Sequence, residues 1–170
     1  YVTNEVADRA NQSIVITDID SNGTNEMFAA TSGTNSLTGT LLTPGYLYSV
    51  ICSTQVDSLT FENFHYLAEY PGGLRQLSRG DADQDGKPNL YIAGHYNEAI
   101  FDWEYNGGDL QNIDSYSETM IFMDDTTDNF TPNNDQGKVR VAKLFSGDID
   151  NDGNGDVVFS SASFATDKPQ

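Results

Sequence analysis

The nine residues Asp148-Ile149-Asp150-Asn151-Asp152-Gly153-Asn154-Gly155-Asp156 decide how this chain is expected to fold. The same pattern occurs twice more, in residues 18–26 and in residues 81–89; we call the three copies loop 1 (18–26), loop 2 (81–89) and loop 3 (148–156). Every copy has an oxygen-bearing side chain at positions 1, 3, 5 and 9 and a glycine at position 6. Apolar residues follow each copy, so the sequence predicts three repeats of one loop-and-strand unit.

Acids on alternate residues of a tight turn suit a calcium ion. Ca²⁺ takes about six to eight oxygen ligands, and glycine at position 6 permits the sharp reversal that wraps the chain around the ion. Without a cation these acids would repel one another. We therefore predict three Ca²⁺ sites, and loop 3, which has four carboxylates, is expected to bind tightest. The predicted ligands are Asp18, Asp20, Asn22 and Glu26 in loop 1, Asp81, Asp83, Asp85 and Asn89 in loop 2, and Asp148, Asp150, Asp152 and Asp156 in loop 3, with the position 7 carbonyls of Thr24, Lys87 and Asn154.

An EF-hand begins with a similar loop, but the rest of the pattern excludes it. An EF-hand needs a bidentate Glu at position 12 and a helix on each side. Position 12 is occupied by Ala29, Ile92 and Phe159. The flanking residues 13–17 and 139–144 are typical of strands, so each loop is expected to join two strands of a hairpin.

The spacing between the loops leaves room for two further strands in each unit. Alternating and apolar stretches predict these strands, and Pro71-Gly72-Gly73 separates the first two units. Four-stranded antiparallel sheets repeated along a chain are the blades of a β-propeller. The predicted fold is therefore all-β, a single partial β-propeller over residues 1–170. Its further strands are expected at 46–52, 59–70, 99–105 and 113–123, and its blades at 13–70, 74–123 and, as a half blade, 138–170.

About two and a half blades are fewer than the roughly four to eight of a closed propeller. The terminal faces are then expected to be apolar and to need a partner. Either the missing remainder of a larger propeller or other copies of the chain would cover them, and copies joined head to tail would give a homo-oligomer or a filament. We favour the first alternative.

The loops, the flanking strands and the period resemble the FG-GAP or VCBS repeats of integrin alpha-subunit propellers and of secreted microbial and algal proteins. In that family the acidic loop binds calcium between the first two strands of a blade, which agrees with the ligands predicted above. The Gly-Ala-Pro that often ends the second strand is Ala93-Gly94-His95 in the second unit. This departure favours the VCBS-type variant over integrin-like ligand binding.

Composition excludes several classes of function. The 170 residues include 26 acids and 8 bases, a formal net charge of −18, which argues against nucleic acids and anionic membranes as partners. No apolar run is long enough for membrane insertion. Cys52 is the only cysteine, so no internal disulfide is expected. No arrangement of Ser, His and Asp and no phosphate-binding loop indicates an enzyme.

These features together predict an extracellular, secreted or cell-surface module, stabilised by calcium, that acts in structure or cell adhesion by joining protein chains. Two alternatives remain open at this stage, a lectin-like propeller that binds carbohydrate and the non-catalytic part of a secreted polysaccharide-acting enzyme. Asn11 and Asn129 lie in Asn-X-Ser/Thr sequences and are candidate glycosylation sites, with glycans as further partners.

Overall fold

The computed structural model describes residues 11–31, 45–50, 64–70, 74–94, 99–123 and 141–161. Within these ranges the chain forms strands and one single-turn 3₁₀ helix, which confirms the all-β class. All strand pairs are antiparallel. The elements are β1 (Asn11–Thr17), β2 (Glu26–Thr31), β3 (Gly45–Val50), β4 (Phe64–Tyr70), β5 (Leu74–Gly80), β6 (Asn89–Gly94), β7 (Ala99–Tyr105), η3 (Ile113–Ser115), β8 (Tyr116–Met123), β9 (Val141–Gly147) and β10 (Asp156–Ser161).

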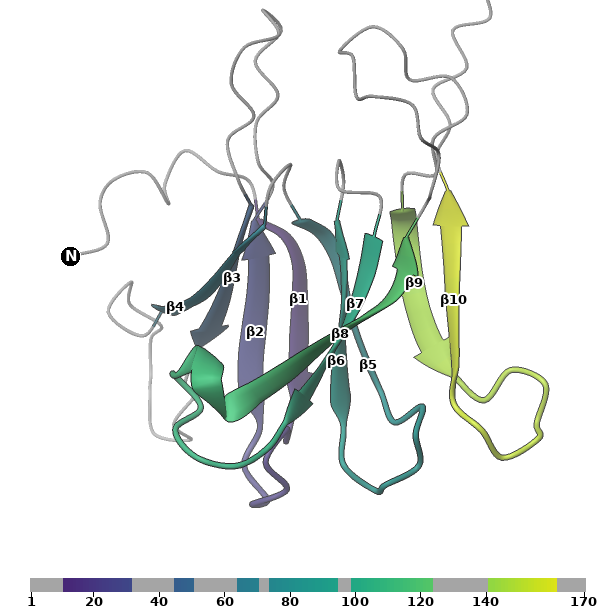
Figure 1. The fold of residues 1–170 in the computed structure, drawn as a ribbon, viewed down its shortest axis with the longest axis horizontal. Helices are drawn as coiled ribbons and strands as arrows, with labels where there is room; N and C mark the ends of the chain where they lie inside the picture. Colours follow the sequence, from purple (N-terminus) through teal and green to yellow (C-terminus); the bar gives the residue numbers. More distant parts are fainter. Residues whose placement is uncertain are drawn as a thin grey trace, which may run out of the picture.

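Each sheet is built from strands that follow one another in the chain (Figure 1). The first sheet has the order β1-β2-β3-β4 and the second has the order β5-β6-β7-β8. Strands β9 and β10 form a two-stranded sheet. The first hairpin of every sheet contains one of the three acidic loops, so the repeat in the sequence is also a repeat in the described structure.

Two apolar cores join the three sheets. The first core lies between the first and second sheets, where Phe28 and Leu47 pack with Leu77 and Trp103. The second core lies between the second sheet and the β9–β10 hairpin, where Tyr91 and Ile100 pack with Val141 and Leu144. Burial of these side chains stabilises the packing of one sheet on the next.

Strand β6 contributes to both cores because successive side chains point to opposite faces of a sheet. Leu90 and Ile92 face the first core, whereas Tyr91 and Ala93 face the second. All six residues of β6 are buried, as the continuous apolar run predicted. Strand β10 differs, since Val158 is 47% exposed.

The first strands of the three sheets are neighbours, and serine hydroxyls connect them. Ser13 Oγ on β1 accepts a hydrogen bond from the Leu77 N–H on β5 at 3.0 Å. Ser78 Oγ on β5 lies 2.9 Å from Ser146 Oγ on β9. Ser146 Oγ also donates to the Arg79 carbonyl. Strand β5 is therefore held between β1 and β9.

Some element boundaries differ from the predicted ones. The strand expected to begin at Ile113 begins at Tyr116, because Asn112 Oδ1 accepts the Asp114 N–H at 3.0 Å and caps η3. In the described part of the chain, no helix has the length and apolar character needed to cross a membrane. Cys52 and Asn129 lie outside the described residues, as do 138–140 and 162–170 of the third predicted unit.

Candidate metal centres

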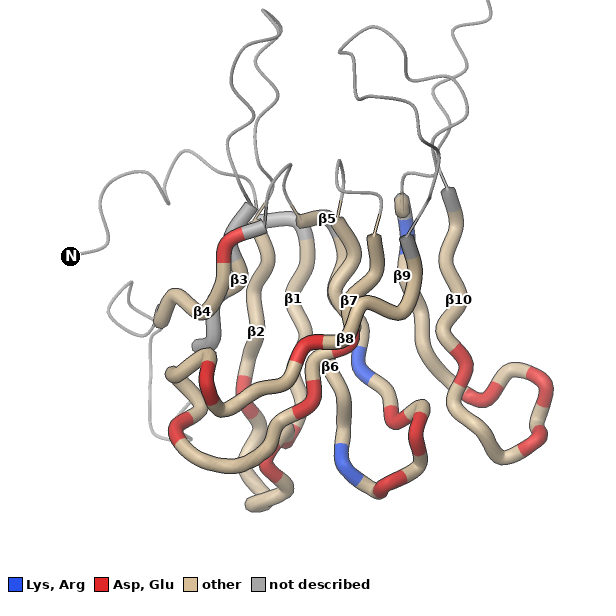
Figure 2. Tube along the Cα trace, viewed as in Figure 1, with Lys and Arg blue, Asp and Glu red and all other residues tan. Residues whose placement is uncertain are grey.

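The three acidic loops lie at the same end of the sheets. Figure 2 shows their Asp and Glu residues along the turns that leave β1, β5 and β9. The strand that precedes each loop and the strand that follows it are paired in register, for example Thr17 with Glu26 and Gly80 with Asn89. This pairing fixes the two ends of the loop and forces the acids between them into a tight turn.

The backbone of each loop reverses at two residues with positive φ. Position 6 is glycine in every loop, with φ between 85° and 91°. Position 4 also has positive φ, between 58° and 60°, although none of its residues is glycine. Residues other than glycine rarely adopt a positive φ, and the sequence pattern did not predict it at position 4. The position 4 residues are Ser21, Gln84 and Asn151.

The same hydrogen bonds recur in all three loops. The position 1 carboxylate accepts the N–H of position 6, at 2.8 Å in loop 1 and 3.0 Å in loops 2 and 3. The position 3 carboxylate accepts the N–H of position 5, and the position 5 side chain accepts the N–H of position 7 at 2.7–2.8 Å. Backbone amides therefore hold the acidic side chains inside the turn.

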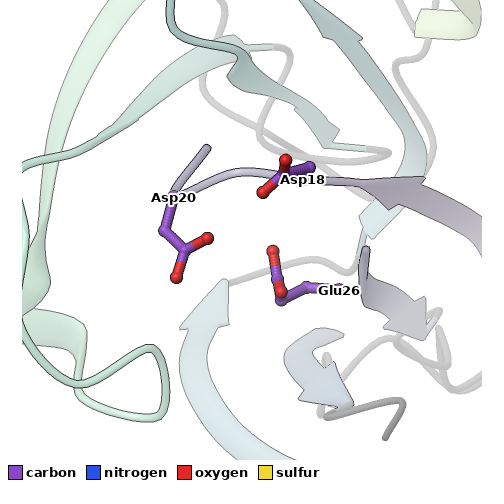
Figure 3. Close-up of side chains that lie close together, drawn as sticks. All are labelled: Asp18, Asp20 and Glu26. Atoms are coloured by element: carbon purple, nitrogen blue, oxygen red, sulfur yellow. The ribbon is translucent and has the colours of Figure 1, made fainter. Parts of the chain in front are cut away.

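In each loop three carboxylates offer oxygen atoms that lie within 4.8 Å of one another. Two oxygens bound to one Ca²⁺ at about 2.4 Å can be at most about 5 Å apart, so this spacing fits a shared ion. Figure 3 shows the three carboxylates of loop 1 turned toward one another. These clusters could hold a metal ion, and they consist of Asp18, Asp20 and Glu26, of Asp81, Asp83 and Asp85, and of Asp148, Asp150 and Asp156.

The other predicted ligands have different surroundings. Asp152 is not in the loop 3 cluster, and its carboxylate accepts both the N–H and the side-chain amide of Asn154 at 2.7 Å. Asn22 donates its side-chain amide to Asp20 at 2.7 Å. The backbone carbonyls of Thr24, Lys87 and Asn154 remain a prediction, because the clusters above are defined by carboxylate oxygens alone. The Lys87 ammonium, which the sequence reasoning did not consider, pairs with Asp85 at 2.8 Å.

Position 9 has the same role in loops 1 and 3. Glu26 Oε2 accepts the Ile19 N–H at 3.0 Å, and Asp156 Oδ2 accepts the Ile149 N–H at 2.9 Å. Each bond ties the end of the loop to its second residue. The acid at position 9 thus closes the turn as well as contributing an oxygen to the cluster.

Loop 2 is closed differently because its position 9 is Asn89. The Ala82 N–H donates to the Tyr91 hydroxyl at 3.1 Å instead. The Asn89 side-chain amide nitrogen donates to Asp102 Oδ1 on β7 at 2.9 Å. Asn89 Oδ1 and Asp81 Oδ1 are both buried and have no hydrogen-bond partner. A buried oxygen without a donor is costly, and a cation in loop 2 would satisfy both atoms.

Burial and neighbouring acids shift several pKa values around the loops. Burial raises the pKa of Glu26 and of Asp102, and nearby carboxylates, Asp20 for Glu26 and Asp83 for Asp102, raise them further. Burial also raises the pKa of Tyr91 to about 12, so its hydroxyl stays protonated. When no cation is bound, the surroundings of Glu26 and Asp102 therefore favour the protonated, neutral form of these two carboxyl groups.

In metal-free buffer, lowering the pH from about 7 toward 5 is expected to stabilise the protein. The folded pKa of Glu26 is raised above the ordinary glutamate value of 4.5, so its stabilising contribution is complete below that value and is lost as the pH rises through the folded pKa. The pKa of Asp102 is also raised above its ordinary value of 3.8, so Asp102 acts in the same direction. Melting temperatures in EDTA at the two pH values measure the effect. A metal-free protein that melts higher at pH 7 would contradict it, whereas with calcium the order is expected to reverse because protons compete with the ion.

Loops 2 and 3 are in direct contact. A cavity of about 310 Å³ lies between them, lined by residues that include Asp81, Tyr91, Asp148 and Asp156. The Gln84 side-chain amide donates to Asn154 Oδ1 across this boundary. The two clusters are thus mechanically connected through their loops.

No protein-family model matches this chain, and none of the curated proteins matches it, so the resemblance to FG-GAP and VCBS repeats stays a prediction.

Proposed function

We propose that this chain is an extracellular structural or adhesion module whose β-sheet units are calcium-stabilised blades of a partial β-propeller. One observation carries the proposal. The same nine-residue loop, in which the acidic side chains accept the same backbone N–H groups of positions 5, 6 and 7, occurs in the first hairpin of each of the three sheets and at the same end of all three. In this function calcium stiffens each hairpin so that neighbouring sheets keep their packing.

The chemistry of the loops favours calcium over magnesium. Each loop offers several carboxylate oxygens, an amide or carboxylate at positions 5 and 9 and a backbone carbonyl at position 7. Ca²⁺ accepts such a large and irregular oxygen set, whereas Mg²⁺ demands near-octahedral geometry and usually keeps several waters. The two orphan oxygens of loop 2 support a cation there in particular.

The packing of the sheets supports a blade arrangement. Consecutive sheets share apolar cores, and β5 lies between β1 and β9. In a propeller, blades surround a central channel and their first strands are neighbours there. Figure 1 shows the three sheets fanned out in chain order.

Exposed apolar side chains at both ends of this array favour a partner. Ile16 on β1 is 58% exposed and Phe145 on β9 is 63% exposed, with Ile14 and Val158 beside them. Large exposed apolar groups on strands are typical of interaction surfaces. We propose that further blades of a larger propeller or other protein chains cover them.

The proposed location follows from the affinity expected of such loops. Extracellular calcium modules bind at about 10⁻⁴–10⁻³ M, which matches calcium outside cells and far exceeds cytosolic calcium. A structural role at that affinity requires an exterior location.

A calcium titration followed by two-dimensional amide NMR tests the proposal. The amides of Gly23, Gly86 and Gly153 report on loops 1, 2 and 3, because each donates to the first Asp of its loop. Each is expected to shift saturably with Ca²⁺ and far less with Mg²⁺. Gly153 is expected to reach half-saturation first, since loop 3 has the most carboxylates. If no amide responds at about 10 mM Ca²⁺, well above the extracellular range, the proposal fails.

A further inference from the structure

Loop 2 lacks the acid that closes the other two loops, and three residues outside its acidic cluster replace that acid. Asn89 stands at position 9, Tyr91 accepts the Ala82 N–H, and Asp102 accepts the Asn89 side-chain amide. Asp102 lies on β7, directly opposite Tyr91 in the pairing of β6 with β7. It belongs to no part of the repeated motif.

The contact between Asp102 and Asn89 determines which way the Asn89 amide points. The Asn89 side-chain nitrogen donates to Asp102 Oδ1 at 2.9 Å, so the NH₂ group of Asn89 faces Asp102. The oxygen of the Asn89 amide, Oδ1, therefore points away from Asp102. Asn89 is 2% exposed, and this oxygen is buried without a hydrogen-bond partner. Position 9 is the place from which Glu26 and Asp156 reach their clusters in loops 1 and 3.

We propose that Asp102 is a positioning residue for the loop 2 cation: it holds the Asn89 amide so that the oxygen, and not the nitrogen, is available to the ion. The inference rests on the proposed binding of calcium by loop 2. Partners that orient metal ligands in this way commonly change affinity without touching the metal.

Asp102→Ala is the direct test. The half-saturation of Gly86 is expected to move to Ca²⁺ concentrations about 10-fold to 100-fold higher, the usual effect of losing an orienting partner. Gly23 and Gly153, in the same sample, are expected to stay within about twofold of their wild-type values, because among the described residues the Asp102 side chain hydrogen-bonds to loop 2 and not to loops 1 and 3. Asp114→Asn, which removes an exposed carboxylate from η3, is the control for net charge and is expected to leave all three amides unchanged.

Asp102→Asn is a second variant that preserves the shape of the side chain. Its amide can donate to Asn89 Oδ1 and turn the Asn89 amide around, so Gly86 is again expected to titrate at higher calcium. This variant keeps the test valid should Asp102→Ala fold poorly.

An Asn89→Asp background separates positioning from a general structural role. A carboxylate at position 89 presents oxygen in either orientation, and it would repel Asp102. Adding Asp102→Ala to Asn89→Asp is therefore expected not to weaken calcium binding at Gly86. A loss of affinity in both backgrounds would mean that Asp102 merely supports the fold, and would overturn the inference.

The remaining outcomes are also decisive. Unchanged Gly86 titration in both Asp102 variants, with all three loops binding calcium in the wild type, overturns the inference and leaves the proposed function standing. A parallel shift of all three amides in Asp102→Ala overturns it as well. Absence of any calcium response in the wild type removes the proposed function and the inference with it.

Discussion

Calcium at about 100 times its dissociation constant is expected to raise the free energy of unfolding of this chain by about 8 kcal/mol. Three loops contribute about 2.7 kcal/mol each when the ion binds the folded state only. The total is comparable with the whole stability of an ordinary domain, about 5–15 kcal/mol. The metal-free chain must hold three clusters of carboxylates within 4.8 Å, so calcium is expected to decide whether the fold is stable.

Urea unfolding with calcium and with EDTA measures this difference. Trp103 is the only tryptophan and is 2% exposed in the first core, so its fluorescence reports on the packing of the first two sheets. Magnesium at the same concentration is the control for ionic strength and for screening of the −18 charge. Equal unfolding midpoints in calcium and in EDTA would contradict the prediction.

The loops could be predicted from the sequence because each is a local structure. The acids, the glycine at position 6 and the apolar exit lie within about a dozen consecutive residues, and local hydrogen bonds fix the turn. The burial of β6 on both faces could also be predicted, since a strand of consecutive apolar residues is stable only when both of its faces are buried.

The surroundings of loop 2 could not be predicted in the same way. Asp102 reaches Asn89 only because β6 pairs with β7 in the register that sets Tyr91 opposite Asp102. The alternation of Phe101 and Trp103 with Asp102 indicates which face of the strand Asp102 occupies, but it does not indicate which residue of β6 lies opposite. A signal was present in retrospect, since Asn89 is the only amide at position 9 among the three loops.

The boundary between loops 2 and 3 was also invisible in the sequence. The loop pattern assigned no role to Gly155 at position 8, yet this residue packs against the backbone of loop 2. Contacts between sheets depend on how two units dock, and the sequence of either unit alone does not specify that docking.

Gly155→Ala is expected to destabilise the protein by on the order of 3 kcal/mol, the upper end of what overpacking costs. A Cβ at position 155 would lie 2.6 Å from the Asp81 carbonyl oxygen and 2.8 Å from the Ala82 Cα. Both are backbone atoms at the start of loop 2, so no flexible side chain can move aside. Loops 2 and 3 must separate, which disturbs both clusters and the docking of the β9–β10 hairpin on the second sheet.

Gly147→Ala is the matched control in the same hairpin. Its Cβ would lie 3.3 Å from an edge atom of the Phe145 ring, which is exposed and can turn away, so a much smaller effect is expected. Urea unfolding in calcium compares the two variants. In Gly155→Ala the amides of Gly86 and Gly153 are expected to lose calcium affinity together while Gly23 keeps it, because only loops 2 and 3 share the contact. A Gly155→Ala protein as stable as Gly147→Ala would show that the two loops do not press on each other, and that the hairpin is free to bind calcium independently of the second sheet.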